Sequence, residues 1–200
     1  MMKIYFMMIV SCFTIFFSGN DNKNDNSIIH KNSVIDTRIE ALKQAFENND
    51  YTKFFQFFPD SYDELVNFYG FDDNKGASPL YSLYEVHINY LFDYEGKIDT
   101  KSFATKIYEV AKNGVWDADA VGLFQSKLSN MIISKPDIFL EILAMKPNKE
   151  MKGFWHFVFD GSEKNDLQNK ERFNAIYKKI KPLNSKQAEI LNHEFKGMYK

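Results

Sequence analysis

The chain has very little cysteine, with only Cys12 among its 200 residues. An exported domain held by disulfide bonds would carry an even set of cysteines. None follows Cys12, so packing alone has to hold the fold. Catalytic motifs are also lacking: there is no His-Glu-x-x-His pair, no Cys/His metal spacing, no Gly-rich phosphate loop and no Gly-x-Ser-x-Gly turn. We therefore predict no catalytic residue, no metal and no cofactor.

Long apolar runs are lacking as well, except near the start. Lys3 precedes an apolar run from Ile4 to Phe17, which has the length of an export-signal core and is shorter than the roughly 20 residues of a comfortable membrane span. An Asn- and Asp-rich stretch follows, with too little apolar surface to fold. We predict an export signal over residues 1–19, a disordered polar tether over 20–32 and a single helical domain over 33–200.

The role of Cys12 depends on how the signal is processed. Ile9-Val10-Ser11-Cys12 resembles the lipobox of bacterial lipoproteins, in which the cysteine receives lipid. Cleavage by a signal peptidase near Ser18 to Asn20 would discard Cys12, and a retained anchor is a third possibility. The apolar run continues from Phe13 to Phe17, which favours discard because lipoprotein tethers turn polar at once. We predict an exported protein, either periplasmic or tethered to a membrane as a lipoprotein; it would meet the membrane only through a lipid anchor or an uncleaved signal.

The remaining sequence gives one helical signal after another. Apolar residues recur at spacings of three and four, and helix starts are predicted near Ser33, Ser61, Asp99 and Asn184. Short connections favour antiparallel neighbours. We predict an all-α fold of about nine to ten helices in antiparallel hairpins, forming an irregular bundle or a short solenoid-like stack, with residues 71–78 as a polar loop.

One apolar stripe contains a histidine, His87. The stripe comprises Leu80, Leu83, Val86, His87, Tyr90, Leu91 and Tyr94. His87 lies at its margin, and we expect it to be half-buried and hydrogen-bonded to a neighbour rather than catalytic.

Two aromatic stretches are candidate binding sites. In the first, Trp116 precedes a predicted helix that starts with Asp117 and Asp119. Asp117 would cap this helix, Asp119 would favour the positive end of its dipole and Trp116 would pack as a staple. The alternative is a surface aromatic beside acids that grips a sugar ring or a cationic partner.

The second stretch, Gly153 to Gly161, contains Trp155, His156 and Asp160. Its neighbouring aromatics cannot all face one way on a helix, so some of them must meet a second buried layer, a partner or solvent.

Charge is unevenly spread along the chain. Residues 36–99 hold thirteen Asp/Glu against five Lys/Arg, a net charge of −8, and residues 163–200 hold nine Lys/Arg against five Asp/Glu, a net charge of +4. Such an asymmetry can turn one end toward a basic partner and the other toward anionic lipid or wall polymer. The export signal and the net charge of −2 argue against nucleic acid as a partner.

Taken together, three landmarks resemble those of uncharacterised exported or lipoprotein-like helical proteins of bacteria. They are Pro59-Asp60-Ser61, Trp116-Asp117-Ala118-Asp119-Ala120 and Phe154-Trp155-His156-Phe157. This resemblance carries no activity. The function that we predict is a non-enzymatic binding protein of the cell envelope with a protein partner. The alternatives are a hydrolase of an envelope polymer that uses paired carboxylates from Asp117, Asp119 and Asp160, or a periplasmic immunity or inhibitor protein.

Overall fold

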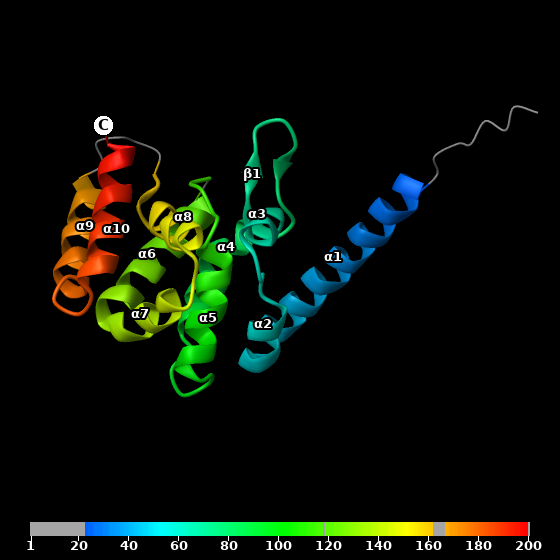
Figure 1. Cartoon of the computed structure of the whole chain (residues 1–200). Coiled ribbons are helices and arrows are strands. Elements are labelled where there is room, and N and C mark those ends of the chain that lie inside the picture. Colours follow the sequence, from blue (N-terminus) through cyan, green and yellow to red (C-terminus); the bar gives the residue numbers. More distant parts are fainter. Residues whose placement is uncertain (1–22, 118, 162–166, 200) are drawn as a thin grey trace, which may run out of the picture. The chain divides into compact units, whose positions relative to one another are not determined.

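A computed structural model describes residues 23–117, 119–161 and 167–199 (Figure 1). Contacts divide the chain into two compact units, Met1–Ile35 and Asp36–Lys200, and helix α1 (Lys23–Glu47) runs through both. The predicted export signal of residues 1–19, including Cys12, lies outside the described residues, as do residues 20–22 of the predicted tether.

The described part of the chain contains ten α-helices and one two-stranded hairpin, which confirms the all-α prediction. Short connections join most of the helices. After α1 the elements are α2 (Tyr51–Phe57), α3 (Tyr62–Tyr69), β1 (Phe71–Asp72), β2 (Gly76–Ala77), the 3-10 turn η1 (Tyr81–Leu83), α4 (Tyr84–Phe92), α5 (Thr100–Ala111), α6 (Asp119–Ser134), α7 (Pro136–Ala144), α8 (Asn148–Phe159), α9 (Leu167–Ile180) and α10 (Ser185–Met198).

Helix α1 differs from the sequence prediction at its start. It begins at Lys23, well before the predicted cap at Ser33, and so includes residues 23–32 of the predicted tether. This segment contains no proline and no glycine, so no backbone-breaking residue stops a helix that extends from residues 33–47 toward the N-terminus. None of the described helices combines the length and the apolar character that crossing a bilayer requires.

Side-chain caps fix the starts of several later helices. Ser61 accepts a hydrogen bond from the Glu64 N–H at 3.3 Å before α3, and Asp99 accepts one from the Ser102 N–H at 2.8 Å before α5. Asn184 caps α10 in the same way. The sequence predicts helix starts at these places because Ser, Asp and Asn side chains satisfy the first free N–H groups of a helix.

Helix α8 lies at the centre of the core of the second unit. Helices α5, α6, α9 and α10 all contact it. Its aromatic residues Phe154, Trp155, Phe157 and Phe159 are therefore all buried, although they point in different directions. Of the three environments that the sequence leaves open for this stretch, a second buried layer is the one that surrounds these rings.

The predicted polar loop of residues 71–78 contains a short antiparallel hairpin, labelled at β1 in Figure 1. Phe71 pairs with Ala77, and Asp72 pairs with Gly76. Asp72 Oδ1 accepts hydrogen bonds from the N–H groups of Asn74 and Lys75, and Gly76 has a φ of +84°, so local turn chemistry closes the hairpin. Strands of two residues leave no alternating pattern for a sequence prediction to detect.

Candidate binding surface

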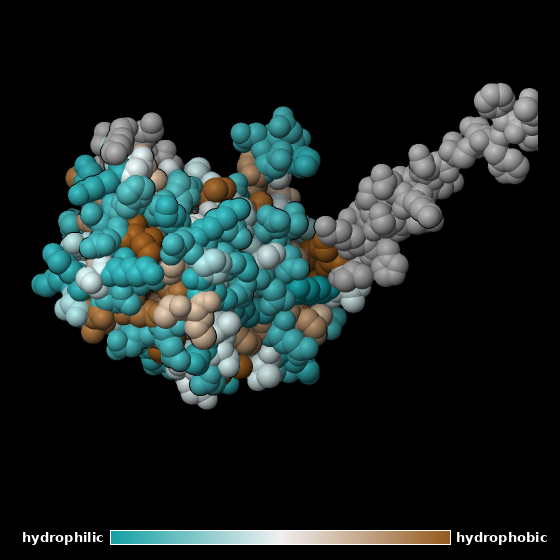
Figure 2. Space-filling model, viewed as in Figure 1, coloured by the Kyte–Doolittle hydropathy of each residue, from teal (hydrophilic) through white to brown (hydrophobic). Residues whose placement is uncertain are grey.

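A row of partly exposed aromatic rings connects the hairpin to the loop before α6. The Phe71 and Tyr81 ring centroids are 5.6 Å apart, and those of Tyr81 and Tyr84 are 5.9 Å apart. Tyr84 in turn borders a surface hollow of about 350 Å³ together with Trp116. Phe71 is 45% exposed and Trp116 is 41% exposed. In Figure 2 apolar side chains appear at the base of the hairpin, whereas its tip is hydrophilic.

Two carboxylates border the same hollow. Glu85 and Asp119 line it beside Tyr84 and Trp116, and both acids are exposed. Asp119 accepts a hydrogen bond of 2.8 Å from the Tyr81 hydroxyl, which raises the pKa of Tyr81. Within the described part of the chain neither acid forms an ion pair with Lys or Arg. Their negative charge therefore faces solvent.

These residues form what we call the aromatic-acidic surface. It comprises Phe71, Tyr81, Tyr84, Glu85, Trp116 and Asp119, and the exposed side chains of Val86 and Val115 adjoin it in the sequence. Of the exposed large hydrophobic residues in the described part of the chain, Phe71 and Trp116 belong to this surface, and Val86 and Val115 are sequence neighbours of its members. Exposed apolar side chains that cluster and are rimmed by charge are typical of interaction sites.

The loop that presents Trp116 is held in place by contacts with the end of α8. The Trp116 N–H donates a 2.6 Å hydrogen bond to Asp160 Oδ2 at the end of α8. Gly114 lies so close to α8 that a Cβ there would be 2.5 Å from the Phe157 ring. Gln125 of α6 donates to the carbonyl oxygens of Phe157 and Asp160 at 2.6 and 3.0 Å. The backbone at Trp116 is thus preorganised by contacts on both sides.

Asp117 and Asp160 both lie near Tyr62 of α3. Burial raises the pKa of Tyr62 to about 12, and the Asp117 and Asp160 carboxylates contribute to this rise. Asp117 also packs against the end of α3, since a Cβ on Gly70 would be 3.0 Å from its Oδ2. The structure therefore brings the two predicted carboxylates to one region. Neither lines the hollow beside Trp116.

The structure separates the other predicted residues from this surface. Trp155 is fully buried, and its indole N–H donates to Gln187 Oε1 at 3.1 Å. Trp155 is therefore a core residue and does not reach the surface, because α10 covers that face of α8. His156 is half-buried, with Nε2 3.9 Å from Asp160 Oδ2.

Several residues of the surface are not found by sequence reasoning. The sequence does not indicate a binding role for Phe71, Tyr81, Tyr84 or Glu85. Val86 is exposed, although the stripe of apolar residues predicts it to face inward. The available signal was that Tyr81 and Tyr84 are aromatic but lie off that stripe.

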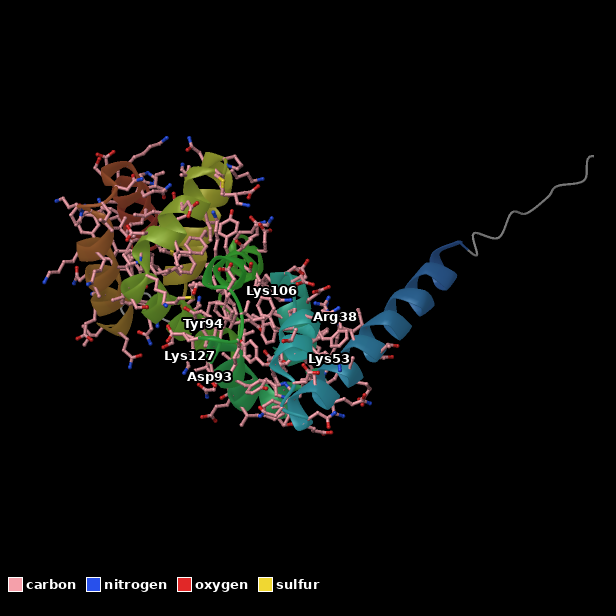
Figure 3. All side chains as sticks on the ribbon, turned by 90° about the horizontal axis from the view of Figure 1, so that it is seen from below. Arg38, Lys53, Asp93, Tyr94, Lys106 and Lys127 are labelled. Atoms are coloured by element: carbon pink, nitrogen blue, oxygen red, sulfur yellow. The ribbon has the colours of Figure 1, made fainter. Side chains whose placement is uncertain are left out.

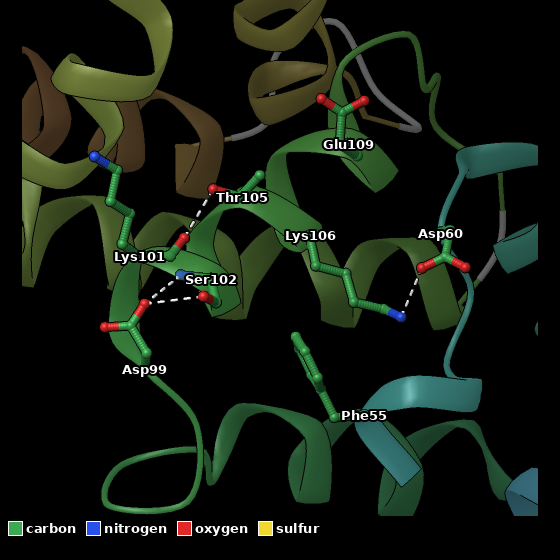
Figure 4. Close-up of a pocket in the computed structure, with 8 residues that line it drawn as sticks. All are labelled: Phe55, Asp60, Asp99, Lys101, Ser102, Thr105, Lys106 and Glu109. Atoms are coloured by element: carbon green, nitrogen blue, oxygen red, sulfur yellow. Dashed lines mark hydrogen bonds and ion pairs between the residues drawn. The ribbon is translucent and has the colours of Figure 1, made fainter. Parts of the chain in front are cut away.

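A larger pocket of about 680 Å³ lies on another part of the second unit (Figure 4). Lys106 of α5 points toward Asp60 there and pairs with it at 2.7 Å. Arg38 of α1, labelled with Lys106 in Figure 3, also pairs with Asp60 at 2.6 Å and with Glu64 at 3.1 Å. Burial alone would raise the pKa of Asp60, but Lys106 and Arg38 lower it overall.

These ion pairs give the larger pocket a structural role. Lys101 on its wall is paired with Glu141 at 2.5 Å, and Asp99 is occupied in capping α5. Arg38 further donates to the carbonyl oxygens of Phe57 and Phe58, so the network joins α1 to the end of α2. Its charges are used inside the fold, unlike those of the aromatic-acidic surface.

The part of the chain that the structure describes has no group of three or more His, Cys, Asp or Glu side chains that could hold a metal ion. Comparison of the chain with protein-family models, with curated proteins and with solved structures finds no match.

Proposed function

We propose that this chain is a non-enzymatic binding protein of the bacterial cell envelope, and that its aromatic-acidic surface binds a basic segment of a partner protein. The observation that carries the proposal is the row of Phe71, Tyr81, Tyr84 and Trp116 beside two carboxylates that have no cationic partner in the described chain.

The chemistry of the surface selects a cationic partner. Aromatic faces attract Lys and Arg side chains, and the nearby acids Glu85 and Asp119 add Coulombic attraction. Residues 36–99, which include Phe71, Tyr81, Tyr84 and Glu85, carry a net charge of −8, which would speed the encounter with a basic segment. Trp and Tyr are also the residues that most often dominate the affinity of protein interfaces.

The envelope location rests on the sequence. Lys3 and the apolar run from Ile4 to Phe17 have the form of an export signal, and the polar residues that follow have the form of its end.

The structure gives the predicted carboxylates positions that favour binding over hydrolysis. A glycoside hydrolase needs two carboxyl groups facing each other across a site that admits substrate. Asp160 instead accepts a hydrogen bond from the Trp116 backbone N–H, and Asp119 accepts one from the Tyr81 hydroxyl. An immunity or inhibitor protein is itself a binding protein, and the identity of the partner would distinguish that case.

Site-specific photo-crosslinking tests the proposal. A photo-reactive amino acid replaces Val115, which is 48% exposed and next to Trp116, in the full chain produced in bacteria. The control position is Leu167, which is 73% exposed and lies at the start of α9. We expect position 115 alone to crosslink to one protein, through a segment of net positive charge, with a yield that falls as salt rises. Equal products from both positions, or an acidic or uncharged crosslinked segment, would overturn the proposal.

A further inference from the structure

Positive charge, opposite in sign to that of the aromatic-acidic surface, is concentrated where α9, α10 and α8 meet. Exposed lysines lie in the last turn of α9, in the α9–α10 turn, in the first turn of α10 and within the first five residues of α8. They are Lys149, Lys152, Lys178, Lys179, Lys181 and Lys186, and we call this group the basic end. Figure 1 shows α9 and α10 side by side, joined by the short turn that carries Lys181.

Contacts between the helices show that these lysines share one end of the fold. Lys152 of α8 and Lys186 of α10 line one hollow of about 400 Å³. At the residues next to these lysines, Gln187 Nε2 donates to Met151 Sδ at 2.7 Å, which holds the two helix starts together. Lys178, Lys179 and Lys181 reach this end through the α9–α10 turn, because Asn184 N–H bonds back to the Ile180 carbonyl.

The charge of the basic end is not neutralised by ion pairs within the fold, and one intramolecular contact of its lysines is that of Lys181 Nζ, 5.3 Å from the centre of the Tyr177 ring. Within the described part of the chain, none of the six lysines forms an ion pair, whereas Lys97, Lys101, Lys106 and Lys135 all do. The residues from Arg172 to Ala188 include no Asp or Glu. Glu189 is the exposed acid that lines the hollow.

Helix stability accounts for only some of the lysines. Lys178 and Lys179 suit the negative end of the α9 dipole. Lys149 and Lys186 lie in the first turns of α8 and α10, where a positive charge opposes the dipole. Their placement is therefore unfavourable for the helices, and a role in binding explains it.

Exposed apolar side chains lie near these lysines in the sequence. Leu183 in the α9–α10 turn is 51% exposed and follows the exposed Pro182. Met145 is 69% exposed and lies in the connection that leads into α8. A soluble polyanion would need only the lysines. A bilayer with anionic lipids accepts both groups, since lysines bind its headgroups while apolar side chains enter the boundary with the acyl chains.

We propose that the basic end binds the surface of a bilayer containing anionic lipids. The lysines contact the headgroups, and Leu183 and Met145 enter the interface. This inference goes beyond the proposed function because it concerns another surface and a lipid in place of a protein.

Vesicle sedimentation with the full chain tests the inference. The probes are vesicles of phosphatidylcholine alone and vesicles of phosphatidylcholine and phosphatidylglycerol in equal amounts. The test variant is Lys178→Gln with Lys179→Gln and Lys181→Gln. The matched control removes the same charge elsewhere, as Lys53→Gln with Lys75→Gln and Lys101→Gln, which are also exposed lysines.

We expect the test variant to bind the anionic vesicles roughly a hundredfold less than the wild type, at about fivefold per lysine. The control triple variant should bind like the wild type. Leu183→Ser should lower binding a few-fold with the lysines intact, because it removes the apolar contact. The apolar run of residues 4–17 is present in every variant, so it cannot produce these differences.

Equal binding of the two triple variants would overturn the inference. So would equal binding to both kinds of vesicle. If DNA or polyphosphate competes fully and Leu183→Ser has no effect, the basic end binds polyanions in general and not a bilayer. The crosslink at position 115 should be unchanged in the test variant, so the failure of this inference and the failure of the proposed function are separate results.

Discussion

His87 should make folding stability depend on pH. Its side chain is fully buried, and Nδ1 lies 3.0 Å from the Tyr69 hydroxyl. The centroids of the Phe46 and Phe54 rings lie 4.5 and 5.4 Å from that of the imidazole. Burial therefore lowers the pKa of His87 from 6.5 to about 4. Tyr69 stays neutral, because burial raises its own pKa.

The sign and size of the effect follow from linkage. The unfolded chain takes up a proton at His87 below pH 6.5, whereas the folded chain does so only near pH 4. Stability is therefore lost as the pH falls through this window, and the total loss is about 3 kcal/mol, from about 1.4 kcal/mol per pKa unit.

Denaturant unfolding of the wild type and of His87→Phe over this pH range isolates the effect. The variant keeps an aromatic ring in the site but does not titrate, so carboxylates contribute equally to both proteins. We expect the difference between their unfolding free energies to change by about 2–3 kcal/mol between neutral pH and pH 4. A flat difference curve, or an imidazole pKa near 6.5 by NMR, would refute the reasoning.

The other predictions concern packing, ion pairing and the proposed surface. Gly114→Ala should lower the unfolding free energy by about 1–3 kcal/mol because the added Cβ would clash with an aromatic ring. Gly122→Ala should raise the unfolding free energy by about 0.5–1 kcal/mol, because Gly122 lies within α6 and an added Cβ would meet no other atom. Denaturant titration measures both changes, and equal effects would contradict the close packing of the loop at Gly114. Arg38→Met should lower the unfolding free energy by about 2 kcal/mol, because carbonyl and carboxylate oxygens lose their hydrogen-bond donor. Lys43→Met breaks an exposed ion pair and should lower the unfolding free energy by less than about 0.5 kcal/mol. Similar losses in the two variants would show that the Arg38 network contributes no more than a surface ion pair. Trp116→Ala should leave the thermal midpoint nearly unchanged but weaken the crosslinked complex more than about tenfold in co-precipitation, and an unaltered complex would remove this residue from the binding surface.

Much of the fold could be predicted because local chemistry fixes the helix ends. The Ser61 and Asp99 caps use only residues within three positions of themselves, and Pro136 at the first position of α7 acts in the same local way. The start of α1 is the exception, since a cap-like residue such as Ser33 does not stop a helix that can continue past it.

The candidate surface could be predicted only in part, because exposure depends on distant packing. Trp116 and Trp155 both stand in aromatic stretches. The contact with Gln187 of α10 buries Trp155, whereas the hydrogen bond to Asp160 holds the loop of Trp116 at the surface. Val86 belongs to the predicted apolar stripe but is exposed. These outcomes are set by partners 30 or more positions away in the sequence, beyond the reach of periodicity.

The central claim is that negative charge on the aromatic-acidic surface recruits a basic partner. The most direct measurement is the yield of the position-115 crosslink when Glu85→Gln and Asp119→Asn are combined, against a control that combines Glu40→Gln and Glu189→Gln at two other exposed acids. Both double variants lose the same charge. The account predicts that the first lowers the yield about tenfold or more, and that the control leaves it unchanged. An equal yield from the two would contradict it.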